Sequence, residues 1–197
     1  HGKTTTTSML SHILLKGECD PTISVGGILP AIGGNIRVGQ SETFLTEACE
    51  YTNSFLSFFP TLGIILNMDA DHLDFFKDID DIRHSFRKFA ELLPADGALI
   101  INADTPKYEM VAENLPCKVI TYGLEHDAEY TASDITYDEF GHPTFHVLHN
   151  GEDIGICSLK VPGIHNVSNA LASIAAGRLL DLDNEVIFAG LKDFGGT

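Results

Sequence analysis

The sequence predicts an α/β fold, a P-loop-type, mainly parallel sheet flanked by helices, with a small antiparallel addition. Three observations lead to this prediction. Gly2-Lys3-Thr4 opens a helical segment, as it does in a phosphate-binding loop. Helical segments then alternate with short apolar segments as far as residue 122, which is typical of parallel strands covered by helices. Residues 128–161 instead alternate apolar and polar side chains around the Asn150-Gly151 pair, which is a hairpin pattern.

The individual elements follow in chain order. The first helix begins at the phosphate loop and runs through Leu15, with Gly17 as its stop. A second helix is expected at residues 79–93, where apolar side chains recur every three or four positions before a turn at residues 94–97. The other expected elements are strands at 22–25, 43–48, 63–68, 98–102 and 118–122, a short helix at 107–114, and closing helices at 166–180 and 184–191.

Composition narrows the range of functions. The chain carries 28 acidic and 12 basic residues, a net charge of −16, which disfavours nucleic acid and anionic membranes as partners. No apolar run approaches the roughly 18 residues of a membrane span. The four cysteines show neither zinc-ligand nor disulfide-framework spacing. Reduced thiols and a cytoplasmic location are therefore expected.

The strongest local signal is Gly2-Lys3-Thr4, followed by Thr5. In a phosphate loop the glycine lets the backbone approach the phosphates, the lysine reaches the β and γ oxygens, and the hydroxyl binds Mg²⁺. Lys3 and Thr4 would take these roles, with Thr5 as a further donor. The three residues also occur together by chance, and the first half of the motif is missing. The prediction therefore depends on the helix start and on the α/β pattern after it.

Two acidic stretches follow expected strands. Glu47 and Glu50 come just after Thr46, where open α/β sheets bind ligands, and one of them suits Mg²⁺; a solvated loop is the alternative. Residues 67–74 hold three aspartates and His72, which suits a metal or phosphate site, although a polar turn that caps a helix explains them equally well. Zinc is poorly supported because no second histidine or cysteine has suitable spacing.

A final polar stretch opens the helix expected at residues 166–180. It contains His165, Asn166 and Asn169. Asparagine at a helix start commonly caps the helix, and its amide can also recognise an adenine edge through paired donor and acceptor groups. On these residues alone, capping is the favoured interpretation.

In this order, the motifs resemble the central, ATP-binding domain of the Mur ligases. They are His-Gly-Lys-Thr-Thr-Thr-Thr, Glu-Ala-Cys-Glu-Tyr, Asp-Ala-Asp-His-Leu-Asp and His-Asn-Val-Ser-Asn-Ala, and the resemblance covers nearly all of residues 1–197. It implies a three-domain enzyme whose amino-terminal UDP-binding domain and carboxy-terminal domain lie outside this chain. On its own, the chain is then expected to bind nucleotide without turnover.

Within the family, the sequence is most similar to the branch that joins L-alanine to UDP-N-acetylmuramate in peptidoglycan biosynthesis. The Glu-Ala-Cys-Glu-Tyr motif and the stretch from Phe86 to Pro94 are the reasons. Branches that add later residues carry a carbamylated lysine at the position of Phe86, and Lys88 would face differently on the helix. The alternatives are a tripeptide-recycling ligase or folylpolyglutamate-type ligase of the same superfamily, and a P-loop NTPase of another class.

The resemblance implies ATP and Mg²⁺ as cofactors, an acyl phosphate intermediate, and UDP-N-acetylmuramate and L-alanine as substrates. It also implies a role for each motif. Lys3, Glu47 and His72 would be catalytic; Gly2, Lys3, Thr4, Thr5, His165, Asn166 and Asn169 would bind ATP; Thr4 and Glu47 would hold one Mg²⁺ and His72 a second metal; and Asn35 would lie near the muramoyl substrate.

Overall fold

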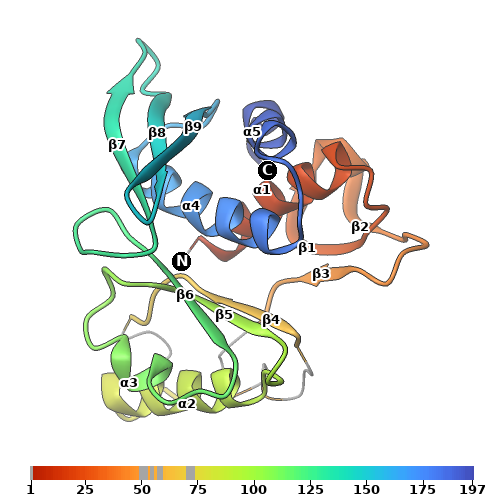
Figure 1. The fold of residues 1–197 in the computed structure, drawn as a ribbon. Helices are drawn as coiled ribbons and strands as arrows, with labels where there is room; N and C mark the ends of the chain where they lie inside the picture. The colour runs from red at the N-terminus through yellow and green to blue at the C-terminus, as the bar shows by residue number, and fades with distance from the viewer. Residues whose placement is uncertain (1, 49–52, 54–55, 57–59, 70–73) are drawn as a thin grey trace.

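The computed structural model describes residues 2–48, 53, 56, 60–69 and 74–197, and it confirms the α/β class. Figure 1 shows helices gathered on both sides of the central strands. The larger sheet has the strand order β4 (Leu62–Ile65), β5 (Ala98–Asn102), β6 (Lys118–Tyr122), β7 (Tyr130–Tyr137), β8 (Pro143–His149), β9 (Glu152–Ser158). The smaller sheet has the order β2 (Gly34–Arg37), β1 (Thr22–Leu29), β3 (Phe44–Thr46). The helices are α1 (Lys3–Lys16), α2 (Ile79–Glu91), α3 (Glu109–Ala112), α4 (Ile164–Leu179) and α5 (Asn184–Asp193), with a 3₁₀ turn η1 (Pro30–Ile32).

The first four strands of the larger sheet are parallel, and β5 among them is covered on both faces. Alternate residues of β5 point in opposite directions. Leu99 and Ile101 pack with apolar side chains of α2 and α3, whereas Ile100 packs with α1 and α4. This arrangement explains why β5 reads as a continuous apolar run rather than as an alternating one.

The rest of the larger sheet is the expected antiparallel addition. Strands β7, β8 and β9 pair antiparallel, and Asn150 and Gly151 form the two-residue turn between β8 and β9. Both turn residues have positive φ, 51° and 82°. Asparagine and glycine tolerate this conformation best, so the hairpin forms where the sequence predicts it.

The strands expected at 22–25 and 43–48 lie in the smaller sheet, where β1 and β3 are parallel. Strand β1 runs four residues further than expected, and β2, which pairs antiparallel with β1, was not expected. None of the four residues of β2 is buried. Because no apolar side chain of β2 faces a core, apolar and polar residues do not alternate along it, and the sequence gives no sign of a strand.

Helix α1 lies at the centre of the molecule, beside the smaller sheet, α4 and α5 (Figure 1). Met9 and Ile13 are fully buried, and a Cβ placed on Gly190 of α5 would lie 2.7 Å from the Cα of Ile13. This close packing holds α1, whose amino-terminal end carries the phosphate-loop residues, against α5. In the described part of the chain, no helix has the length and apolarity to cross a bilayer.

Candidate functional site

The amino-terminal turn of α1 forms one side of the candidate site. Gly2 is the N-cap residue, with φ 80° in the left-handed region, and its carbonyl accepts a hydrogen bond from the amide of Thr6 at 2.8 Å. Lys3, Thr4 and Thr5 occupy the first turn and are half-buried. A helix start presents backbone N–H groups and partial positive charge, which favour phosphate.

Glu47, just after β3, meets Thr4 across the site. The Thr4 hydroxyl donates to Glu47 Oε1 at 2.7 Å, although the two residues are 43 positions apart in the chain. The backbone amide of Gly26 in β1 donates to Glu47 Oε2. The hydroxyl and carboxylate oxygens converge in the way that a hard cation such as Mg²⁺ requires, so this pair fits the predicted metal site.

The start of α4 forms another wall. Asn169 Nδ2 donates to Asn166 Oδ1 at 3.1 Å, and Asn166 Nδ2 donates to the Pro162 carbonyl at 2.9 Å. A Cβ added to Gly2 would lie 2.8 Å from Asn169 Oδ1, so Asn169 lies against the phosphate-loop glycine. The N-cap of α4 is Gly163 without a side-chain cap, and therefore neither asparagine caps this helix. Both asparagine side chains are buried.

The remaining predicted site residues lie elsewhere or outside the description. His165 is exposed on the first turn of α4. Asn35 is exposed on β2, which flanks β1 on the side opposite to β3 and Glu47. His72 and Glu50 fall outside the described residues. The structure therefore brings together Gly2, Thr4, Glu47 and Asn169, and leaves the other assignments as predictions.

Gly26 is a site residue that sequence reasoning missed. Its amide holds Glu47, and a Cβ there would lie 2.6 Å from Glu47 Oε2. Two adjacent glycines, Gly26 and Gly27, directly after the strand expected at residues 22–25, signal a close approach by another group. The sequence therefore indicates that another group lies close to these glycines, but it does not identify that group as the Glu47 carboxylate.

Comparison with known proteins identifies the family. A family model described as the Mur ligase middle domain matches residues 1–177. The chain belongs to the Mur ligase family. Its site therefore lies in the domain that the sequence motifs indicated.

Among sequence relatives, a UDP-N-acetylmuramate–L-alanine ligase from Lachnospira eligens is 61% identical over 198 residues, and one from Agathobacter rectalis is 56% identical over 197. In each case the match covers 100% of this chain and 43% of the relative. The chain thus spans less than half the length of these Mur ligases.

Solved Mur ligase structures share the fold. A UDP-N-acetylmuramate–alanine ligase from Thermotoga maritima has a TM-score of 0.86 and 30% identity, with 100% of this chain and 44% of that chain covered. A UDP-N-acetylmuramate:L-alanyl-γ-D-glutamyl-meso-diaminopimelate ligase from Neisseria meningitides has a TM-score of 0.89 and 28% identity, with 100% and 64% covered. Fold similarity alone does not separate these two branches of the family.

Proposed function

We propose that this chain is the ATP-binding domain of a UDP-N-acetylmuramate–L-alanine ligase. The observation that carries the proposal is the identity of 61% and 56%, over the whole chain, to two proteins of that name. The contact between Thr4 and Glu47 supports it, because it assembles an oxygen-rich cation site next to the phosphate loop. Cys19, Cys117 and Cys157 are free thiols, which agrees with the cytoplasmic location that we propose for the enzyme.

The reaction begins with attack of the sugar-nucleotide carboxylate on the γ-phosphate of ATP, which forms an acyl phosphate and releases ADP. Both reactants are anionic, so positive charge must hold them together. Lys3 binds the phosphate oxygens, and Mg²⁺, when bound, neutralises further phosphate charge. Thr4 and Glu47 are the residues that would hold this ion. The acyl phosphate then reacts with the amine of L-alanine to form the amide and release phosphate.

The other assignments complete the proposed site. His72 would help to hold a second metal, which would supply further positive charge where the two anionic reactants meet. His165, Asn166 and Asn169 would contact the base or ribose, and Gly2 and Thr5 would contact the phosphates. Asn35 would lie towards the muramoyl substrate. These roles follow from the family resemblance.

A tripeptide-recycling ligase is the second candidate, favoured by the TM-score of 0.89 to the Neisseria enzyme. The test is phosphate release by the full-length enzyme with ATP, Mg²⁺ and UDP-N-acetylmuramate. L-Alanine, glycine, L-serine, L-glutamate and a cell-wall tripeptide are offered separately. We expect L-alanine to give the fastest release. Release with the tripeptide alone would assign the enzyme to the recycling branch, and release independent of the sugar nucleotide would exclude both candidates.

A further inference from the structure

The carboxylate of Glu47 is held at both of its oxygens. Thr4 donates its hydroxyl to Oε1 at 2.7 Å, and the Gly26 amide donates to Oε2. The pairing of β1 with β3 covers Thr22 to Ser24, so Gly26 lies beyond the last residue of β1 that is paired with β3, on the side where Glu47 follows. An amide that would otherwise belong to a sheet ladder therefore points at a side chain.

The Glu47 carboxylate and the Thr4 hydroxyl fill the space beside Gly26. A Cβ there would lie 2.6 Å from Glu47 Oε2 and 3.1 Å from the Thr4 hydroxyl oxygen. The φ of Gly26 is not among the positive values, so its backbone conformation does not itself require glycine. The neighbouring Gly27 differs, since a Cβ there would make only ordinary contacts, 3.4 Å to Thr4 Cγ2 and 3.5 Å to Thr197 Cβ.

We propose that Gly26 is a positioning residue for the Mg²⁺ site, through its amide and through the absence of a side chain. This inference rests on the proposed function, in which Thr4 and Glu47 hold the ion. A Cβ at position 26 would push the carboxylate away from the Thr4 hydroxyl, so the two oxygens would no longer converge. Groups that orient metal ligands typically change metal affinity about 10- to 100-fold when they are altered.

The test compares Gly26→Ala with Gly27→Ala in the full-length enzyme. Mg²⁺-dependent ATP binding is measured directly by calorimetry, and L-alanine-dependent phosphate release is measured alongside it. We expect Gly26→Ala to raise the Mg²⁺ concentration for half-maximal binding about 10-fold or more, with the KM for L-alanine unchanged. Gly27→Ala should behave as the unmodified enzyme does. Equal Mg²⁺ requirements for the two variants would overturn the inference.

A double variant separates crowding from misfolding. In Gly26→Ala/Glu47→Asp, the shorter side chain makes room for the added methyl group. The Mg²⁺ requirement should rise less than the product of the two single effects, because the residues are coupled. Multiplicative effects would contradict the proposal. Normal Mg²⁺-dependent ATP binding without L-alanine-dependent release would reject the proposed function and leave the role of Gly26 to be decided by the binding data.

Discussion

At the scale of single residues, the candidate site depends on small groups placed against polar ones. Gly2 lies against Asn169, and Gly26 lies against Glu47. In both places a side chain would occupy space that an amide or a carboxylate already fills. The charged and hydroxyl groups of Lys3 and Thr4, which carry the chemistry in our proposal, lie on the first turn of α1. The short side chain of Thr4 keeps its hydroxyl close to the backbone of α1, whereas the ammonium group of Lys3 lies at the end of a flexible side chain.

Replacing Lys3 with alanine should abolish phosphate release while leaving the fold intact. The side chain is half-buried at the start of α1, and its proposed partner is the phosphate of ATP. Losing one such charged contact to the transition state typically lowers kcat about 100- to 1000-fold. The full-length variant would be assayed for phosphate release and for Tm. Lys16→Ala, at the other end of α1, is the control, and a large loss of Tm in Lys3→Ala alone would contradict the catalytic role.

Replacing His72 with alanine should raise the Mg²⁺ concentration that the full-length enzyme needs. The proposed reason is the loss of one ligand to the second metal. Initial rates would be measured across a Mg²⁺ titration. His126→Ala removes an exposed histidine that contacts Asp104 at 2.8 Å and serves as the control. An unchanged Mg²⁺ dependence in His72→Ala would remove this residue from the metal site.

At the scale of elements, polar side chains add contacts between segments that also share the apolar core. Arg178 of α4 donates to the Tyr130 hydroxyl at 3.0 Å, to Asn184 Oδ1 at 2.6 Å and to His149 Nδ1 at 3.4 Å. Because arginine can only donate, His149 Nδ1 must accept, and His149 Nε2 then donates to Glu129 at 2.9 Å. One side chain therefore ties α4 to the antiparallel strands and to α5, beside a cavity of about 550 Å³.

Replacing Arg178 with methionine should lower the thermal stability of the chain. Three acceptors lose their donor, at a typical cost of about 1–3 kcal/mol. For a domain of this size the Tm should fall by roughly 2–10 °C. Thermal unfolding followed by circular dichroism would measure the change. Lys118→Met changes an exposed cation beside the same cavity and should have little effect; similar losses in both variants would refute the network.

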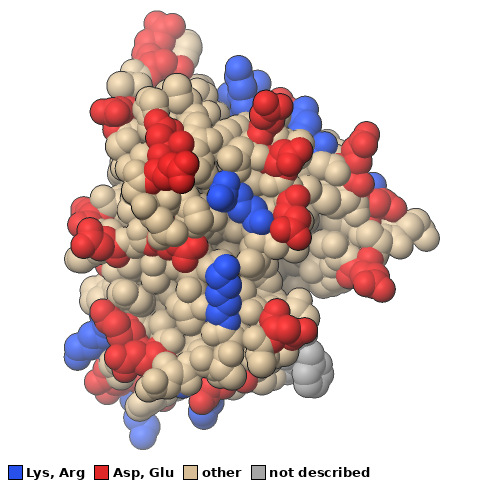
Figure 2. Space-filling view, in the orientation of Figure 1, with Lys and Arg blue, Asp and Glu red and all other residues tan. Residues whose placement is uncertain are grey.

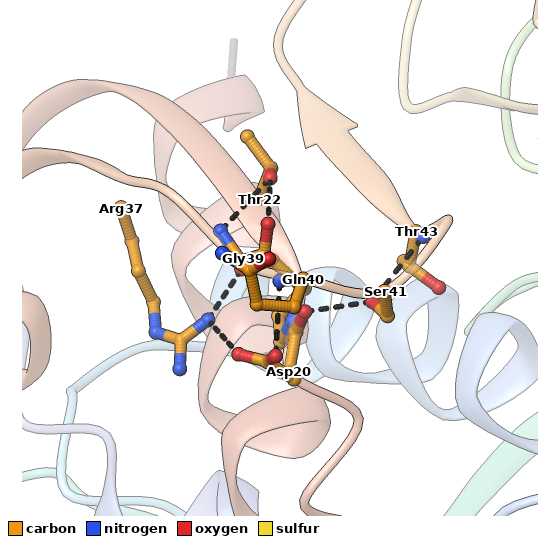
Figure 3. A network of polar contacts seen from close by, with 8 residues as sticks. Asp20, Thr22, Arg37, Gly39, Gln40, Ser41 and Thr43 are labelled. Atoms are coloured by element: carbon orange, nitrogen blue, oxygen red, sulfur yellow. Dashed lines mark hydrogen bonds and ion pairs between the residues drawn. The ribbon is translucent and has the colours of Figure 1, made fainter.

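A second network of polar contacts, shown in Figure 3, holds the smaller sheet together. Asp20 accepts from the Gln40 amide at 2.9 Å and pairs with Arg37 at 3.0 Å, and Arg37 also donates to the Pro21 carbonyl at 2.6 Å. Ser41 donates to the Asp20 carbonyl at 2.7 Å. These bonds hold the segment after β2, which contains Gln40 and Ser41, against the residues just before β1. They explain how a sheet with an exposed strand keeps its shape.

Stability contributed by Asp20 should disappear in acid. The Gln40 amide, and after it Arg37, holds the pKa of Asp20 below its usual value of 3.8. A lowered pKa means that the contribution is complete above pH 3.8 and is lost as the pH falls through the lower folded-state value. Asp20→Asn should therefore lower Tm at pH 7 and have a shrinking effect below pH 4. Asp96→Asn, on an exposed turn, is the control. If the difference in Tm between Asp20→Asn and the unmodified chain did not change with pH, the proposed contribution of the Asp20 carboxylate would be contradicted.

At the scale of the whole molecule, charge is the dominant surface property. The chain has a net charge of −16, and Figure 2 shows acidic side chains spread across the visible face, with fewer basic ones between them. Such a surface repels itself and repels polyanions. The phosphate ligand that we propose would therefore depend on local groups, which in our proposal are the helix start and Lys3, rather than on the overall field.

Added salt should stabilise the chain at neutral pH. Raising NaCl from about 0.01 to 0.15 M shortens the Debye length from about 30 to 8 Å, which screens repulsion among the acidic groups. Salt also weakens pairs such as Lys16–Asp193, but 28 acidic residues face only 12 basic ones, so repulsion dominates. Tm should rise with salt at pH 7.5, and the rise should shrink near the pI of about 4.7. A fall in Tm at pH 7.5 would show that attractive pairs prevail.

Local patterns were enough to determine most elements and the chemical character of the site. The helix from Lys3 to Lys16, the strand at Ala98–Asn102 and the Asn150-Gly151 turn lie where propensity and periodicity place them. Their signals come from neighbouring residues, so no tertiary information is needed. The phosphate-loop motif and the order of the polar stretches likewise indicated the family.

Only the tertiary structure decided which distant groups meet. The family resemblance already paired Thr4 with Glu47, and the structure shows their direct contact across 43 residues. The approach of Gly26 to the same carboxylate, from a third segment, was found only in the structure. The separate sheet formed by β1, β2 and β3 also depends on long-range pairing. A sequence pattern records which side a residue faces and how the chain turns locally. It does not record which partner lies across the fold, because that choice is made by packing between segments far apart in the chain.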